Sequence, residues 1–236
     1  MSSSTTPVDL LVLAAHPPEL RGFRPELGDS LTGTIEGLHV VTKTVGVGMG
    51  VAGGSAAKRI FQLEPRAVVL VGTCGVYPGI PDYRPYDIIL GSKFQLVDQA
   101  EIAGLASFPD PMQTELPANA PLTAGLASHA PRGRVVPLGS PLAPTRDDAM
   151  AAAVPQRTGC HAESLEAFSI AHACLLGQVP FAAVLGVTHV AGSTAMTDFR
   201  QFERQASIAA AEVILRWLHH GAQGLPHRAY RDERFR

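Results

Sequence analysis

Runs of consecutive apolar residues recur along the chain, and each ends at a short stretch rich in glycine, proline or polar residues. An unbroken run of strand length indicates a strand that is buried on both faces of its sheet. Runs of this kind, with a few shorter apolar segments, predict strands at residues 8–15, 38–45, 67–71, 87–90, 93–97, 134–138 and 181–187.

Apolar residues at helical spacing follow several of these strands and predict helices at residues 56–61, 122–129, 162–176 and 199–219. Residues 103–121 predict a loop, and its length is typical of a binding loop or an interface element. Alternation of strands and helices is typical of α/β proteins. We therefore expect one domain over residues 1–236, a three-layer sandwich whose mostly parallel, twisted central sheet carries helices on both faces. Flexible ends are expected at residues 1–7 and 221–236.

Composition and charge exclude several classes of protein. Hydrophobic residues make up 46% of the chain and charged residues 17%, which is enough apolar material for a large core and unlike a disordered chain. The net charge of −2 comes with no long basic run, so we expect neither a nucleic-acid nor a membrane partner. Three cysteines without a C-x-x-C pattern, and the lack of a signal-like segment, predict a cytoplasmic protein.

Residues with catalytic or ligand-binding groups lie where the predicted strands end. Ligands of open α/β sheets bind beside the carboxyl ends of the strands. Four strand ends carry such residues, and a predicted helix adds a glutamate in its first turn: His16 and Glu19, Gly46–Gly50, Gly72–Gly75, Thr188 and His189, and Glu166. We expect these residues to form one site.

The glycine loop Gly48-Met49-Gly50-Val51-Ala52-Gly53 formally matches the G-x-G-x-x-G pattern of dinucleotide-binding proteins. That pattern also needs an acidic residue at the end of the next strand, where residues 69–73 have none, so no dinucleotide cofactor is expected. The backbone N–H groups of Gly46, Gly48 and Gly50 remain candidates for holding an anion or a ribose hydroxyl. The alternative is a tight turn between a strand and a helix.

The segment Ala15-His16-Pro17-Pro18-Glu19 is similar to the A-H-P-D-D motif of zinc-dependent sugar deacetylases. The first aspartate of that motif is Pro18 here and the second is Glu19. Proline offers no metal ligand, so no metal site is expected. Ordinary turn and helix-start residues are the alternative reading of His16 and Glu19.

Two further motifs carry hydroxyl and carboxylate groups. Gly72-Thr73-Cys74-Gly75 places a hydroxyl and bare backbone amides at a strand end, which suits a phosphate or a ribose. In the segment 162–168, Glu166 falls at the start of an apolar helix, where burial without a partner is unfavourable. A vicinal diol could donate to both oxygens of that carboxylate; a charge serving the helix dipole is the alternative.

Taken in order, these motifs resemble the family of methylthioadenosine/S-adenosylhomocysteine nucleosidases and hexameric purine-nucleoside and uridine phosphorylases. The resemblance covers about residues 8–218 and includes Glu19, GVGMG, VLVGTCG, DIILGS, ESLEA and the strand that ends at Thr188-His189. It implies a nucleoside phosphorylase-like fold, a nucleoside ligand and a homo-oligomer.

The resemblance also implies roles, residue by residue. Glu19 lies where the nucleosidases keep the glutamate that activates the attacking water. Glu166 matches the glutamate that binds the ribose 2′ and 3′ hydroxyls, and Leu165 replaces the methionine under the sugar. Ser164 stands where nucleosidases have a second glutamate, and Thr73 matches the Ser/Thr of the G-[S/T]-x-G motif.

Several positions depart from the family pattern. His189 replaces an aspartate that donates a proton to the purine N7 atom, and we expect the histidine to protonate the leaving base instead. Leu70 and Leu185 replace arginines, the first of which binds phosphate in the hexameric phosphorylases. The phenylalanine that stacks on the base is missing near Ala143.

These features predict cleavage of the N-glycosidic bond of a purine-type nucleoside by water. Phosphorolysis, with phosphate as a second ligand, is the first alternative. A nucleoside-binding protein without turnover, or an enzyme with a pocket adapted to an unusual nucleoside, is the second.

Overall fold

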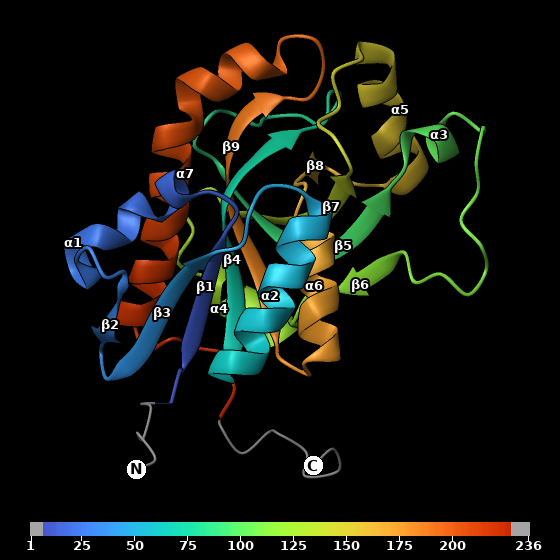
Figure 1. Ribbon diagram of the computed structural model, residues 1–236. Coiled ribbons are helices and arrows are strands. Elements are labelled where there is room, and N and C mark those ends of the chain that lie inside the picture. Colours follow the sequence, from blue (N-terminus) through green and yellow to red (C-terminus); the bar gives the residue numbers. More distant parts are fainter. Residues whose placement is uncertain (1–6, 228–236) are drawn as a thin grey trace.

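The computed structural model describes residues 7–227, whose nine strands form one mixed sheet in the order β2-β3-β1-β4-β8-β7-β5-β6, with β9 paired to both β4 and β5 (Figure 1). The strands are β1 (Leu10–Ala14), β2 (Thr32–Ile35), β3 (Leu38–Thr44), β4 (Ala67–Val76), β5 (Ile88–Val97), β6 (Glu115–Pro117), β7 (Arg134–Pro141), β8 (Ala162–Glu163) and β9 (Phe181–Val190).

The sheet is mixed rather than mostly parallel. Parallel pairs link β1 with β3 and β4, β4 with β9, and β7 with β5 and β8. Antiparallel pairs link β2 with β3, β4 with β8, and β5 with β6 and β9. Because β4, β9, β5, β7 and β8 each pair with the next, these five strands close into a ring.

Helices cover both faces of the sheet, which confirms the predicted α/β sandwich. They are the 3₁₀ helix η1 (Pro17–Phe23), α1 (Arg24–Leu27), α2 (Met49–Leu63), α3 (Gln99–Ile102), α4 (Ala120–Ala127), α5 (Asp148–Thr158), α6 (Ala167–Leu176) and α7 (Ala195–His219). In Figure 1, α2 and α6 lie together in front of the sheet, while α7 and α4 lie on its other side. Each layer has its own apolar core: Ile60 and Ile170 belong to the first, Leu122 and Trp217 to the second.

Two of the longer helices follow directly from the sequence. Helix α2 begins after Gly48, whose φ of 91° favours glycine, and it buries Ala52, Ala56 and Ile60 at helical spacing. Helix α7 buries one apolar stripe against β9, and the indole N–H of Trp217 donates to the Gln223 carbonyl at 2.9 Å.

The structure corrects several predicted boundaries. Residues 72–75 are not a turn, because β4 continues through them to Val76 while pairing with β9 and β8. Residues 87–90 and 93–97 belong to one bulged strand, β5, and the predicted loop 103–121 contains β6. The predicted helix 162–176 begins at Ala167, since residues 162–163 form β8.

Four elements of the described chain had no prediction: β2, α1, α3 and α5. The start of η1 at Pro17 agrees with the alternative reading of Glu19 as a helix-start residue. In the C-terminal segment, the Gln223 carbonyl accepts from Trp217 and the Pro226 carbonyl accepts from Arg66 at 2.8 Å. The other residues of the predicted flexible ends, 1–6 and 228–236, lie outside the described residues. Within the described part, no helix has the length and apolar character needed to cross a membrane.

Candidate active site

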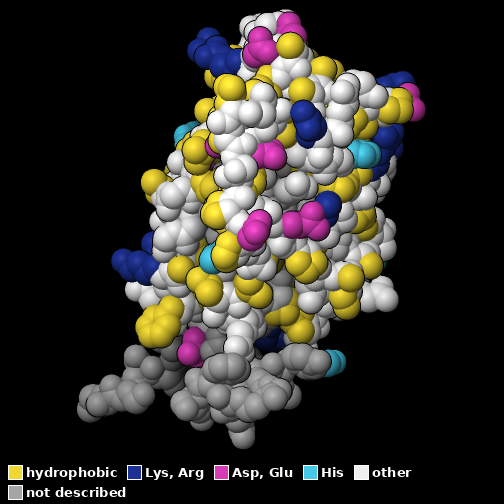
Figure 2. Space-filling model, turned by 90° about the vertical axis from the view of Figure 1, so that its right-hand side faces the viewer, with side chains coloured by type: hydrophobic (Ala, Val, Ile, Leu, Met, Phe, Trp, Pro, Cys, Tyr) yellow, Lys and Arg dark blue, Asp and Glu magenta, His cyan; other side chains and the backbone are white. Residues whose placement is uncertain are grey.

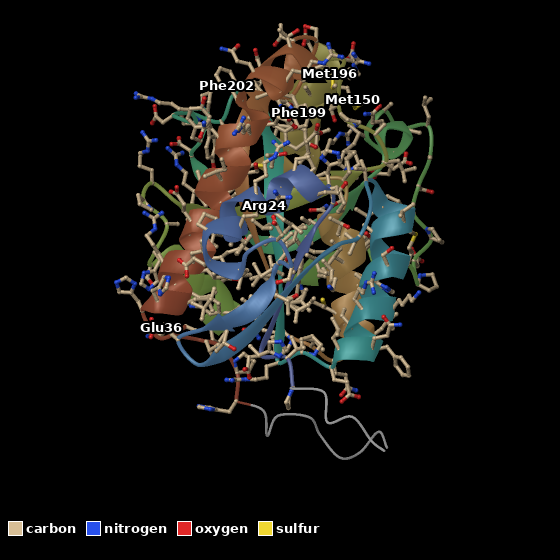
Figure 3. The ribbon with its side chains drawn as sticks, turned by 60° about the vertical axis from the view of Figure 1, so that its left-hand side comes forward. Arg24, Glu36, Met150, Met196, Phe199 and Phe202 are labelled. Carbon is tan, nitrogen blue, oxygen red and sulfur yellow. The ribbon has the colours of Figure 1, made fainter. Side chains whose placement is uncertain are left out.

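A cavity of about 390 Å³ opens where β1, β4 and β9 end. Its lining comes from segments far apart in the sequence: residues 15–21 after β1, Val47 before α2, Thr73 and Gly75 of β4, Pro144 and Arg146 after β7, residues 163–166, His189 of β9, and one side of α7 from Ala195 to Ser207. Figure 3 shows Met196 and Phe199 near the N-terminal end of α7. Strand ends and the long helix therefore enclose one site, as the positions of the motifs predict.

Glu19 stands on the wall formed by η1. Its Oε2 atom accepts the backbone N–H of His16 at 3.1 Å, a reciprocal cap at the start of the 3₁₀ helix. The carboxylate lies directly over Gly72: a Cβ atom at that glycine would be 2.6 Å from Oε1. Burial raises the pKa of Glu19 to about 8; the nearby charge of Glu166 adds to the rise, and the backbone groups of His16, Thr73 and Ala15 oppose it.

Glu166 faces the same cavity from the residue before α6. It is the N-cap residue rather than part of the first turn, and its side chain does not cap its own helix. Instead Oε1 accepts the Gly48 N–H at 2.9 Å and Oε2 accepts the Ser164 hydroxyl at 3.4 Å. Burial raises the pKa of Glu166, and the hydrogen bonds from Gly48 and Ser164 oppose that rise.

The glycine loop therefore positions a carboxylate. The Gly48 N–H, predicted to be available to an anion or a ribose hydroxyl, is already bonded to Glu166. Gly46 and Gly50 do not line the cavity, and Gly50 lies inside α2. Gly46, with φ of 95°, packs against Val51, where any side chain would clash.

His189 lies on β9 beside a β-bulge. Cys74 of β4 pairs with Val187 and Gly75 pairs with His189, so Thr188 is the extra residue. The imidazole ring lies over Gly75, where a Cβ atom would be 2.5 Å from Nε2, and its Nδ1 is 2.7 Å from the Thr188 hydroxyl. The ring also meets the Phe199 ring edge-on at 6.3 Å between centroids. Burial lowers the pKa of His189, and the charge of Asp198 partly offsets this.

The remaining predicted residues take different positions. Thr73, Ser164 and Leu165 line the cavity, and Gly72 lies beneath Glu19. Leu70 and Leu185 are 2% and 1% exposed in the apolar core, so no cation occupies the positions of the two family arginines.

One carboxylate of the site had no sequence prediction. Glu163, 4% exposed, lines the cavity from β8, and its two oxygens accept the Thr145 N–H at 3.1 Å and the Thr145 hydroxyl at 2.7 Å. Burial raises its pKa, and the Thr145 hydrogen bonds oppose the rise. Glu163 thus ties the loop that follows β7 to the floor of the cavity. Only its place beside the Ser164-Leu165-Glu166 motif could have pointed to it.

The mouth of the cavity carries three cations: Arg21, Arg146 and Arg204. Across residues 7–227, no carboxylate lies within ion-pairing distance of these three. No group of three His, Cys, Asp or Glu side chains in the described chain could hold a metal ion. The cavity lining thus offers carboxylates, the imidazoles of His16 and His189, and apolar side chains such as Phe199. Such groups can bind hydroxyls, orient water and move protons.

Known structures with the same fold include nucleosidases. The 5′-methylthioadenosine/S-adenosylhomocysteine nucleosidase of Helicobacter pylori, solved with butyl-thio-DADMe-Immucillin-A, superposes with a TM-score of 0.81 at 13% identity, over 92% of this chain and all of that one. The corresponding enzyme of Colwellia psychrerythraea, solved with adenine, has a TM-score of 0.80 at 18% identity, with 94% and 98% covered. The futalosine hydrolase of Helicobacter pylori has a TM-score of 0.77 at 14% identity, with 89% and 97% covered.

These identities are low, and the likeness concerns the fold. No curated protein sequence matches the chain. A family model described as the phosphorylase superfamily, however, matches residues 4–219, which is most of the sequence. The chain belongs to the phosphorylase superfamily.

Proposed function

We propose that this protein is a nucleosidase, which cleaves the N-glycosidic bond of a purine-type nucleoside with water. The observation that carries the proposal is the approach of Glu19 and Glu166 within one cavity, close enough for the charge of Glu166 to raise the pKa of Glu19. Proteins of the same fold include enzymes solved with 5′-methylthioadenosine and with adenine in their structures, and a futalosine hydrolase.

In the proposed reaction, Glu166 accepts hydrogen bonds from the ribose diol. Its Oε1 keeps the Gly48 N–H and its Oε2 keeps the Ser164 hydroxyl, and each oxygen has a further lone pair for a hydroxyl of the ribose. The carboxylate charge then lies near the sugar as the C1′–N bond lengthens and positive charge develops. A preorganised charge of this kind stabilises the transition state more than the bound substrate.

Glu19 and His189 divide the proton transfers between them. The bonding pair of C1′–N leaves with the base, whose nitrogen takes a proton from the His189 imidazolium. Water attacks C1′ and passes a proton to the Glu19 carboxylate, so the sum of the steps adds one water across the bond. Both groups line the same cavity, Glu19 on η1 and His189 on β9, as general acid–base catalysis requires.

Base release tests the proposal. Purified protein is incubated with methylthioadenosine, S-adenosylhomocysteine, adenosine, inosine and futalosine, with and without phosphate, and free base is separated by chromatography. We expect release without phosphate from at least one nucleoside, with a loss of about 100-fold or more in Glu19→Gln. Glu26→Gln, whose side chain contacts His219 away from the cavity, is the matched control.

Phosphorolysis remains the alternative because the mouth of the cavity has three unpaired arginines, Arg21, Arg146 and Arg204. Release that depends on phosphate would establish it. Tight binding of a nucleoside without any release would favour a binding protein, and Glu19→Gln would then leave the affinity unchanged.

We further propose that the protein is a homo-oligomer. Side chains of α2 and α6, which pack together, leave large apolar groups exposed: Val51, Phe61, Leu175 and Leu176. Figure 2, which views the side of α6, β6 and α3, shows hydrophobic side chains over much of that face. Light scattering on the purified protein and on Phe61→Glu would test this, with a shift to monomer expected in the variant.

A cytoplasmic location is proposed as well, since Cys74, Cys160 and Cys174 are buried and unpaired. Fractionation of the native host with an antibody to the protein would check it.

A further inference from the structure

The bulge in β9 brings two consecutive side chains together. In a regular strand, Thr188 and His189 would point to opposite faces of the sheet. Because Thr188 has no partner on β4, its hydroxyl comes to 2.7 Å from Nδ1 of the next residue. Thr188 is fully buried, so no solvent competes for this contact.

The hydroxyl has a second contact, and that contact determines where the protons lie. Thr188 Oγ1 is 3.1 Å from the Cys74 carbonyl oxygen, which can only accept. A hydroxyl has one proton, and this proton goes to Cys74. The 2.7 Å contact must then run the other way, with the Nδ1–H of His189 donating to Oγ1.

The opposite nitrogen lies against a residue of the cavity wall. Nε2 lies above Gly75, which lines the cavity, and only the missing Cβ of that glycine allows the ring to approach so closely. From α7 the ring meets Phe199 and the charge of Asp198, and from β4 it meets Gly75, while the Cys74 carbonyl contacts the Thr188 hydroxyl.

We propose that Thr188 is a positioning residue, which holds His189 as the Nδ1–H tautomer and leaves Nε2 as the nitrogen that exchanges a proton with the ligand. The inference rests on the proposed function. As the glycosidic bond breaks, the Nε2–H bond of the imidazolium breaks too, its electron pair stays on Nε2, and the proton joins the leaving base. The ring is left as the neutral tautomer that Thr188 already favours, so no rearrangement follows the transfer.

The first test reads the tautomer directly, without any substrate. Protein labelled with ¹⁵N-histidine is studied by long-range ¹H–¹⁵N correlation NMR at pH 8, and the His189 signals are assigned by their loss in His189→Asn. We expect a protonated Nδ1 and an unprotonated Nε2. An unprotonated Nδ1 in the wild-type protein would overturn the proposal.

Substitutions of Thr188 provide the second test. Thr188→Val, of similar shape, removes the hydroxyl, and we expect mixed tautomers and a fall of about 10- to 100-fold in kcat for base release, with KM within about threefold. Thr188→Ser keeps the hydroxyl and should restore both the tautomer and kcat, whereas a role in packing alone would not be rescued in this way. An unchanged tautomer in Thr188→Val would refute the assignment.

The two proposals fail in different ways. The expected tautomers without base release from any nucleoside would confirm the role of Thr188 in holding the ring and overturn the nucleosidase function. Base release by a protein in which His189 is a mixture of both tautomers would support the nucleosidase function and show that Thr188 does not position the ring.

Discussion

Gly72→Ala tests whether the position of Glu19, rather than its presence alone, supports catalysis. A Cβ atom at residue 72 would be 2.6 Å from Oε1 of Glu19, 3.1 Å from Cδ and 3.3 Å from Oε2. Its three nearest neighbours all belong to the Glu19 carboxylate, the far end of a flexible side chain. The added methyl group therefore displaces the carboxylate and leaves the strand in place.

The expected size of the effect follows from this geometry. Ordinary contact needs about 3.4 Å, so Oε1 must move by roughly 0.8 Å, and a misplacement of about 1 Å can reduce a rate by about 100-fold. The same change should lower the free energy of unfolding by about 1–3 kcal/mol, the usual range for an added methyl group, because the nearest atoms belong to a flexible side chain. We expect kcat/KM to fall by about 100-fold while the protein stays folded.

Steady-state base release and urea unfolding measure the two quantities side by side. Gly54→Ala is the matched control, since that glycine lies in α2 with no atom within 4 Å of the added Cβ; there we expect unchanged activity and a small gain in stability. In a Glu19→Gln background, Gly72→Ala should have little further effect, because both changes act on one group. Full activity in Gly72→Ala, or strictly additive losses in the double variant, would show that the carboxylate over Gly72 is not the catalytic group.

Three further outcomes follow from the buried carboxylates and His189. The pH profile of kcat/KM should be bell-shaped, with its two bends at the lowered pKa of His189 and at the pKa of about 8 of Glu19. Because the reaction needs the Glu19 carboxylate and the His189 imidazolium, Glu19→Gln should remove the rising limb and leave a single fall at the His189 pKa, and a rising limb that persists would assign it to another group. The free energy of unfolding should decrease as the pH rises from about 4.5 to about 8, because above 4.5 the unfolded chain has released the proton that folded Glu19 retains. Calorimetry should find a smaller pH dependence of this free energy in Glu19→Gln, and an equal pH dependence in both proteins would contradict the raised pKa of Glu19. Thr145→Val should lower the unfolding free energy by about 1–3 kcal/mol by removing the hydroxyl that Glu163 accepts, whereas Thr34→Val on the exposed edge strand should change it little.

The sequence predicts the site better than it predicts the elements around it. Glu19 lies over a hundred residues from Glu166 and His189 in the sequence, yet the rule that ligands bind at strand ends brings the three together, and one cavity does contain all three. The rule works because it depends on the direction of the strands and not on their exact ends. The continuation of β4 through Gly72–Gly75 therefore changes the local structure of that motif and leaves its place in the site unchanged.

Glu163 shows where sequence reasoning ends. It belongs to a strand of two residues whose existence depends on β4 and β7, and no periodic pattern fits into two positions. The bulge at Thr188 is hidden for the same reason: the residues of β9 read as a regular strand, and only its register with β4 shows the extra residue. Both features arise from pairing between distant segments, so neither is present in local sequence.

A histidine at position 189, in place of the aspartate of the family pattern, is consistent with the raised pKa of Glu19. At neutral pH burial leaves Glu19 protonated and His189 neutral, whereas the proposed reaction needs the carboxylate and the imidazolium. These two arrangements contain the same number of protons, and the raised pKa of Glu19 and the lowered pKa of His189 both favour the unreactive one in the free protein. A ribosyl cation in the cavity reverses this preference, because positive charge near Glu19 and Glu166 favours their ionised forms. The proton of Glu19 then passes to His189, which gives a proton to the leaving base as the glycosidic bond breaks. Glu19 is left as a carboxylate, so its charge stabilises the transition state and contributes little to the binding of the neutral substrate.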